Sequence, residues 1–163
     1  MGHLIRKSLK HKAILVVCCV LSLMSISCDN QEIYYRFHEV NNAEWAQNDT
    51  LTFDIDSTLF EVNVPYKISL EVTNNVNYPY QNIWLFVQSN INDTVFNEQS
   101  KEYLLADEFG KWKGSGFGSL FQSSLPLDNV VFKEKKNYQI KLEHGMRDVS
   151  LKGIEKVGLK ISK

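Results

Sequence analysis

The 163-residue sequence has no cysteine after position 28. This absence excludes a disulfide framework and a thiolate metal site for the rest of the chain. The same part has only two histidines, His38 and His144, which lie far apart in the sequence, and a lone histidine is a poor start for a zinc site. We therefore expect no metal or other cofactor, and a fold that is held together by its hydrophobic core alone.

The sequence also lacks a surplus of positive charge. Residues 1–12 hold four of the 18 basic residues and no acidic residue, so the chain from Cys28 onward has 14 basic and 19 acidic residues and a net charge of −5. A protein that binds nucleic acid needs a basic face to meet the phosphates. This balance argues against a nucleic-acid partner.

No apolar run is long enough to cross a membrane. The longest run covers residues 13–26, whereas a spanning helix needs roughly 20 residues. It follows the basic residues 1–12 and precedes Ser27 and Cys28, which is the order of a secretory signal. A cysteine at the cut predicts a lipoprotein signal over residues 1–27, with Cys28 acylated as the membrane anchor. The alternative is an ordinary secreted protein that is cut near Ser27 and keeps Cys28 as a free thiol.

Alternation of apolar and polar residues dominates the chain from residue 51 onward. It is clearest over residues 66–73 and recurs over 51–56, 138–143 and 157–162, as half-buried strands require. The apolar run 83–87 predicts a further strand, covered on both faces or on one face and by a loop. With about eight such strands and no amphipathic helix, we predict an all-β antiparallel sandwich or jelly roll.

Three regions follow from these patterns. Residues 1–27 form the cleaved signal peptide. Residues 28–50 are polar with scattered aromatics and alternate over 33–38, which predicts a lipid-anchored tether that includes a first strand. Residues 51–163 form a single β-sandwich domain.

Several groups of residues invite a catalytic or ligand-binding interpretation. The glycine-rich residues 110–118 lack the Lys-Ser/Thr ending and the following helix of a phosphate loop, so we interpret them as a bent strand where backbones approach closely. Asp54, Asp56, Asp107 and Glu108 could suggest the paired carboxylates of glycoside cleavage, but alternation places Asp54 and Asp56 on the solvated face of one strand. Asp and Glu oxygens could also bind calcium, but no loop supplies carboxylates at alternate positions ending in a Gly turn. His144 and Arg147 follow no nucleophile-elbow motif; we expect His144 to bind backbone groups and Arg147 to pair with an acid. We predict that the protein is not an enzyme.

The three tryptophans, Trp45, Trp84 and Trp112, could form an aromatic platform for a sugar. Trp84 lies in the apolar run and is expected in the core, and Trp112 points inward because it alternates with lysines on either side. Trp45 is therefore the one surface aromatic that we expect. A carbohydrate-binding lipoprotein of a nutrient-uptake system is the alternative function.

Three segments carry a resemblance to a known family: residues 77–86 (NYPY followed by NIWLF), residues 110–118 (GKWKGSGFG) and residues 144–147 (HGMR), with Gly-Ile and Val-Gly pairs near the end. In this order the chain resembles the GldH-type gliding-motility lipoproteins of Bacteroidota over roughly residues 35–160. The resemblance implies a lipid-anchored outer-membrane protein that the gliding apparatus and the linked type IX secretion system need. It implies no catalysis and carries over no ligand residues.

We therefore predict an accessory or scaffold lipoprotein. Its sandwich surface would hold partner proteins, namely other motility and secretion lipoproteins and membrane proteins, near the outer membrane. Only Asp29 and Glu32 follow the cysteine as early acids, which favours the periplasmic face over export to the cell surface. The positions expected to face a partner or to be structurally demanding are Trp112, Gly114, Gly116, His144 and Arg147.

Overall fold

The computed structural model describes residues 31–92 and 96–163. Cys28 and the signal expected over residues 1–27 lie outside the described residues, so the lipidation site and the cut remain predictions. In the described part, the regular structure is almost entirely β-strand, and none of its helices is long and apolar enough to span a membrane. The strands are β1 (Glu32–Glu39), β2 (Glu44–Ala46), β3 (Leu51–Ile55), β4 (Pro65–Asn75), β5 (Asn82–Ser89), β6 (Asn97–Leu104), β7 (Ser115–Phe117), β8 (Leu120–Val131), β9 (Tyr138–His144), β10 (Ser150–Lys152) and β11 (Ile154–Ser162), with the 3-10 helices η1 (Asn41–Ala43) and η2 (Ser57–Leu59).

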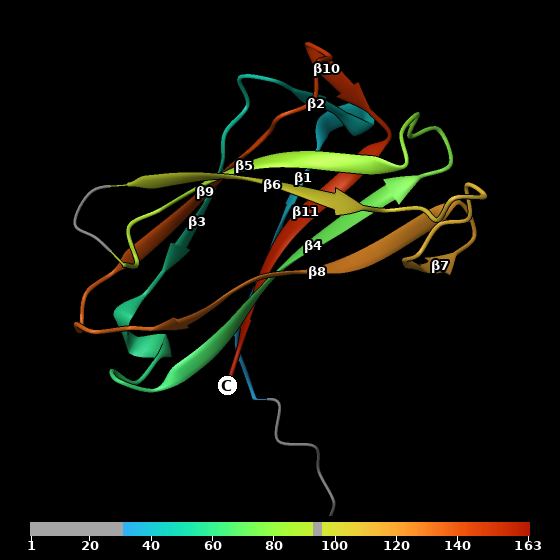
Figure 1. Ribbon diagram of the computed structural model, residues 1–163. Coiled ribbons are helices and arrows are strands. Elements are labelled where there is room, and N and C mark those ends of the chain that lie inside the picture. The colour runs from blue at the N-terminus through green and yellow to red at the C-terminus, as the bar shows by residue number, and fades with distance from the viewer. Residues whose placement is uncertain (1–30, 93–95) are drawn as a thin grey trace, which may run out of the picture. The chain divides into compact units, whose positions relative to one another are not determined.

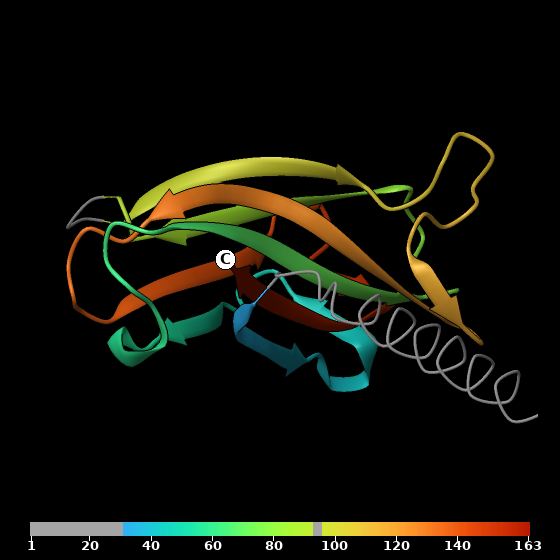
Figure 2. The same ribbon diagram turned by 90° about the horizontal axis from the view of Figure 1, so that it is seen from below.

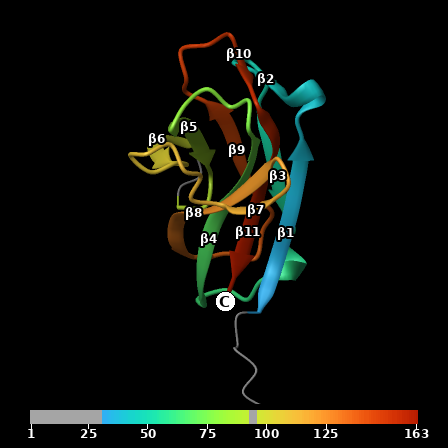
Figure 3. The ribbon, with the colours of Figure 1, turned by 90° about the vertical axis from the view of Figure 1, so that its right-hand side faces the viewer.

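All strand pairs are antiparallel, and they form two main sheets (Figure 1). The five-stranded sheet has the order β1-β11-β4-β8-β7, and the four-stranded sheet has the order β3-β9-β5-β6. A short ribbon pairs β10 with β2. Figure 2 shows the long curved strands from below, and Figure 3 shows β1, β11 and β4 side by side. The predicted antiparallel all-β class is confirmed, although the described residues contain more strands than the eight expected, because three-residue strands are too short to show alternation.

Both sheets contribute to a single hydrophobic core. The inward residues of each long strand follow the period of two that a half-buried strand requires. Phe53, Leu70, Leu85 and Leu142 are nearly or completely buried in the same cluster, although they come from β3, β4, β5 and β9. Side chains from two sheets in one cluster are the mark of a sandwich.

The folded body begins before residue 51. β1 pairs with β11 from Glu32↔Ser162 to Glu39↔Lys156, and the compact unit starts at Gln31. The strand expected within residues 28–50 is therefore an outer strand of the five-stranded sheet. The polar segment before residue 51 does not act as a tether alone, because most of it belongs to the sandwich.

Two tryptophans exchange the places that the sequence predicts for them. Trp45 is completely buried, its indole N–H donates to the backbone oxygen of Asp49 at 2.8 Å, and its ring meets His144 edge to face. Trp84 is 39% exposed on the outer face of β5, whereas its neighbours Ile83 and Leu85 point into the core. The expectation of a buried Trp84 and a surface Trp45 was wrong. Trp84 is exposed because the four-stranded sheet is covered on one face only, and Trp45 is buried because β2 pairs with β10.

Candidate functional site

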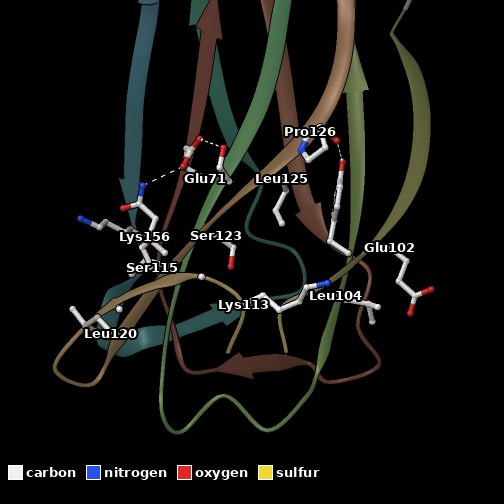
Figure 4. Close-up of a pocket in the computed structure, with 16 residues that line it drawn as sticks. Glu71, Glu102, Leu104, Lys113, Ser115, Leu120, Ser123, Leu125, Pro126 and Lys156 are labelled. Carbon is white, nitrogen blue, oxygen red and sulfur yellow. Dashed lines mark hydrogen bonds between the residues drawn. The ribbon is translucent and has the colours of Figure 1, made fainter. Parts of the chain in front are cut away.

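An open groove of the described residues runs along β8, near its pairing with β7 (Figure 4). Its volume is about 970 Å³. Five elements bring side chains to it, namely β4, β6, β7, β8 and β11, together with the loop that leads from β6 to β7. The lining residues include Glu71, Thr73, Leu104, Lys113, Gly114, Gly116, Ser123, Ser124, Leu125 and Lys156.

A buried carboxylate organises the outer face of the sheet beside this groove. Glu71 is 2% exposed and accepts hydrogen bonds from the hydroxyls of Ser124 (2.6 Å) and Ser69 (3.2 Å) and from the amide nitrogen of Gln122 (3.1 Å). Lys160 lies 3.3 Å from the same carboxylate and neutralises its charge. Because every oxygen of Glu71 already has a partner, this residue stabilises the groove and is poorly placed to act as a free base.

Two buried hydroxyls in the groove have no hydrogen-bond partner within the part of the chain that the structure describes. They are Oγ1 of Thr73 and Oγ of Ser123, both on nearly buried residues. A buried hydroxyl without a partner costs roughly 1–3 kcal/mol.

The glycine-rich segment is constrained by close approach. A Cβ atom on Gly114 would lie 2.6 Å from the backbone oxygen of Gln122, and one on Gly116 would lie 2.7 Å from the ring of Phe121. The next element is strand β8, not the helix that a phosphate loop requires. This geometry agrees with the bent-strand interpretation. Trp112 packs half-buried between Tyr78 and Phe121.

His144 and Arg147 lie away from this groove. His144 is buried at the end of β9, where its ring meets the backbone and the indole of Trp45. Arg147 is exposed and makes no ion pair with a described residue. Its neighbour Asp148 accepts a 2.7 Å hydrogen bond from the Tyr80 hydroxyl instead. The expected pairing of Arg147 with an acid was therefore wrong.

Arg147 lines a second, smaller groove of about 360 Å³ on the four-stranded sheet, together with Tyr80, Asn82, Trp84, Gly145 and Met146. Trp84 is the more exposed of its two aromatic side chains, the other being Tyr80. If the protein bound a sugar on an aromatic platform, Trp84 and not Trp45 would supply it.

Burial lowers the pKa of the His144 imidazole below its ordinary value of 6.5, against smaller opposing effects of the Trp45 backbone, Asp148 and Glu143. The folded state therefore keeps this ring neutral, while the unfolded chain binds a proton below about pH 6.5. The folded state therefore suffers no penalty from the neutral ring above that pH, and it loses stability relative to the unfolded chain as the pH falls. We expect wild type to lose more free energy of unfolding between about pH 7.5 and 5.5 than His144→Leu. Urea unfolding at both pH values measures this, and equal losses would contradict it.

The acids that could suggest catalysis serve local structure. Asp54 accepts from the Gln139 amide, Asp56 accepts from Thr58 at the start of η2, and Asp107 accepts two backbone N–H groups of its own turn. Among residues 31–92 and 96–163, no three His, Cys, Asp or Glu side chains gather as metal ligands would. Each of these three carboxylates is thus held by a hydrogen bond from a neighbouring group.

The groove residues could not be found from sequence patterns. Ser123, Ser124 and Leu104 belong to no motif, and their proximity depends on how β8 pairs and on where β6 ends. The glycines at 114 and 116 were the only local signal of this site. They indicated a close approach of two backbone segments, and the groove lies next to that approach.

The described body is thus a β-sandwich with an open groove that residues of both sheets line. The family model described as GldH lipoprotein matches residues 32–161, and this chain belongs to that family. The gliding motility lipoprotein GldH homolog of Christiangramia forsetii is 28% identical over 145 residues, covering 84% of this chain and 87% of the relative. Gliding motility lipoprotein GldH of Flavobacterium johnsoniae is 26% identical over 161 residues, covering 94% and 96%. These relatives are named as lipoproteins of gliding motility and not as enzymes, and family membership makes this chain a lipid-anchored membrane lipoprotein.

Solved structures resemble the chain only distantly. Dimeric latent PorU of Porphyromonas gingivalis aligns with a TM-score of 0.31 and 9% identity, over 85% of this chain and 13% of PorU. A structure of infectious bursal disease virus, strain Gx, aligns with a TM-score of 0.27 and 8% identity, over 82% of this chain and 31% of the viral chain. A likeness at this level carries no information about function.

Proposed function

We propose that this protein is an accessory or scaffold lipoprotein, anchored by Cys28 at the periplasmic face of the outer membrane. There it holds proteins of the gliding-motility and type IX secretion machinery. The observation that carries this proposal is the match to the GldH lipoprotein family over residues 32–161, nearly the whole folded body. The open groove supports a role in binding.

The anchor sets the local concentration of the sandwich at the membrane. One acyl chain binds a bilayer only marginally, whereas two or more give stable anchoring. A Cys28 that carries two or more acyl chains would therefore keep the domain at the membrane surface even when its contacts with partner proteins are weak. Binding to membrane-bound partners then becomes effectively intramolecular and needs little affinity of its own.

We expect Cys28→Ala to abolish incorporation of radiolabelled fatty acid and to move the protein from the membrane fraction to the soluble fraction. The physical reason is that this thiol is the only one that remains after the cut. Cys18→Ala is the matched control and should leave labelling unchanged. Continued labelling of Cys28→Ala would place the anchor elsewhere and contradict the proposal.

Deletion of the protein in its host tests the scaffold role. We expect the deletion strain to secrete fewer type IX substrates and, where the host glides, to lose surface movement. Wild type supplied in trans should restore both, and Cys28→Ala should restore neither in full. Normal secretion and normal movement in the deletion strain would contradict the proposed function.

A further inference from the structure

The first described residue and the last lie at the same end of the sandwich. The backbone N–H of Lys163 donates to the Gln31 oxygen at 3.0 Å, and β1 begins where β11 ends, because Glu32 pairs with Ser162. β4 also begins at this end, since Lys67 pairs with Ser162 from the other side of β11. Figure 1 and Figure 3 show these three strand ends together. The described chain therefore begins and finishes at one end of the body.

The loop that joins β3 to β4, residues 56–64, lies at this end as well. Its Glu61 carboxylate lies 3.2 Å from the Lys163 ammonium. Its Asn63 N–H donates at 2.9 Å to the oxygen of Phe132, in the turn that joins β8 to β9. These contacts hold the β3–β4 loop beside both the C-terminal residue and the β8–β9 turn.

The β3–β4 loop presents two apolar side chains to solvent. Leu59 is 39% exposed and Val62 is 38% exposed, whereas Phe60 between them is buried in the core. The carboxylate of Asp56 caps the 3-10 helix η2 by accepting the N–H of Thr58 at 2.8 Å, which fixes the start of the loop. The fold thus uses Phe60 for its core and leaves Leu59 and Val62 available to an outside surface.

Lysines surround these two apolar side chains. Lys67, Lys133 and Lys135 are exposed at this end and make no ion pair with a described acid. The Lys135 ammonium lies 5.0 Å from the centre of the Phe60 ring, so it is beside the β3–β4 loop. Two acids of the loop and the turn already have lysine partners, in the pairs Glu61–Lys163 and Glu134–Lys136. Unpaired positive charge next to exposed apolar side chains is the combination that favours contact with lipid headgroups.

The predicted anchor brings this end of the sandwich close to a bilayer. Three peptide links separate Cys28 from Gln31, and they span at most about 11 Å whatever their conformation. The headgroup layer on one side of a bilayer is itself roughly 5–8 Å thick. Acyl chains on Cys28 therefore keep the Gln31 end at the headgroups or just above them.

We propose that the β3–β4 loop makes a second contact with the bilayer that holds the acyl chains. Leu59 and Val62 enter the boundary between headgroups and acyl chains, and the ammonium groups of Lys133 and Lys135 meet lipid phosphates beside them. This inference rests on the acylation of Cys28 in the proposed function. It adds to that function the surface on which the sandwich stands.

A second contact fixes the direction in which the sandwich points. A single flexible link at Cys28 would let the body rotate, whereas two contacts hold one end down. β8 begins at the opposite end, because Leu120 pairs with Asn75, which ends β4. The groove beside β7 is therefore held away from the bilayer, where partner proteins can reach it.

Single thiols test this contact directly. Cys28 is the only cysteine that remains after the predicted cut, and acylation blocks its sulfur, so an introduced cysteine is the only free thiol. Val62→Cys places this thiol in the β3–β4 loop. Val149→Cys is the matched control, because Val149 is 78% exposed and directly precedes β10 at the opposite end (Figure 1). Both positions are exposed, so both variants should fold.

The measurement uses the mature acylated protein, purified from host membranes and reconstituted in vesicles of phosphatidylethanolamine and phosphatidylglycerol. Each thiol carries an environment-sensitive fluorophore. We expect nitroxide-labelled lipids to quench the probe at residue 62 roughly threefold more strongly than the probe at residue 149, because the headgroup boundary reaches the first and not the second. Equal quenching in protein that carries its acyl label would overturn this inference and leave the proposed function standing. Absence of the acyl label would overturn both.

A charge reversal tests the role of the lysines. Lys133→Glu should lower the quenching of the probe at residue 62 roughly twofold in the same vesicles, because it repels anionic lipid. Lys111→Glu is the matched control, an exposed lysine between β6 and β7, and should leave the quenching unchanged. Equal quenching in the two variants would overturn the assignment of lipid phosphates to this end of the sandwich.

Discussion

Replacing Trp45 with alanine is expected to lower the free energy of unfolding by about 3–5 kcal/mol. The side chain is completely buried, donates a hydrogen bond to the Asp49 backbone and packs on His144. Its removal would leave both a cavity and a backbone oxygen without a partner. Urea or thermal unfolding of the purified protein measures the change.

Trp84→Ala is the matched control for this prediction. The ring of Trp84 is 39% exposed on the outside of β5, so its removal leaves no closed cavity and should cost about 1 kcal/mol or less. The two variants remove the same side chain from the same domain. A larger loss for Trp84→Ala than for Trp45→Ala would mean that Trp84, and not Trp45, is the buried tryptophan.

Gly153→Ala is expected to cost about 3 kcal/mol or more. Gly153 has φ +84°, in the left-handed region, and a Cβ there would lie 2.5 Å from the backbone nitrogen of Tyr78. Backbone cannot move aside as a flexible side chain can. A displacement of residue 153 away from Tyr78 would also strain the hydrogen bonds that it makes with the backbones of Ala43 (2.7 Å) and Asn75 (2.9 Å).

Gly110→Ala isolates the conformational part of this cost. Gly110 has a similar φ of +79°, but no heavy atom lies within 4 Å of its added Cβ. We expect a loss of about 1–2 kcal/mol from the left-handed conformation alone. Chemical denaturation of both variants gives the comparison, and equal losses would mean that the contact with Tyr78 is relieved without cost.

Glu71 and the side chains bound to it hold one side of the groove in place. A charged group buried on the outer face of a sheet is costly unless its partners are complete. Here Ser69, Gln122, Ser124 and Lys160 supply them from β4, β8 and β11. These contacts hold β8 against β4 and β11.

The class of the fold follows from local periodicity. Residues 66–73 alternate so regularly that a strand there needs no tertiary information, and the absence of an amphipathic helix after the apolar run excludes mixed architectures. The lack of cysteines likewise indicated a fold that depends on its apolar core. The structure agrees with both conclusions.

Periodicity does not reveal which face of a strand another layer will cover. The run 83–87 looks buried throughout, yet Trp84 faces solvent because the four-stranded sheet packs on one side only. Trp45 sits in a polar stretch, yet the pairing of β2 with β10 carries it inside. Burial of these two residues depends on long-range pairing, which no local pattern encodes.

Alternation along the chain was thus sufficient for the class of fold. Long-range pairing of strands was needed to make Glu32–Glu39 part of the sheet and to bury Trp45. The reason is that alternation is a property of neighbouring residues, whereas edges, registers and covered faces are properties of strands that meet from distant parts of the chain.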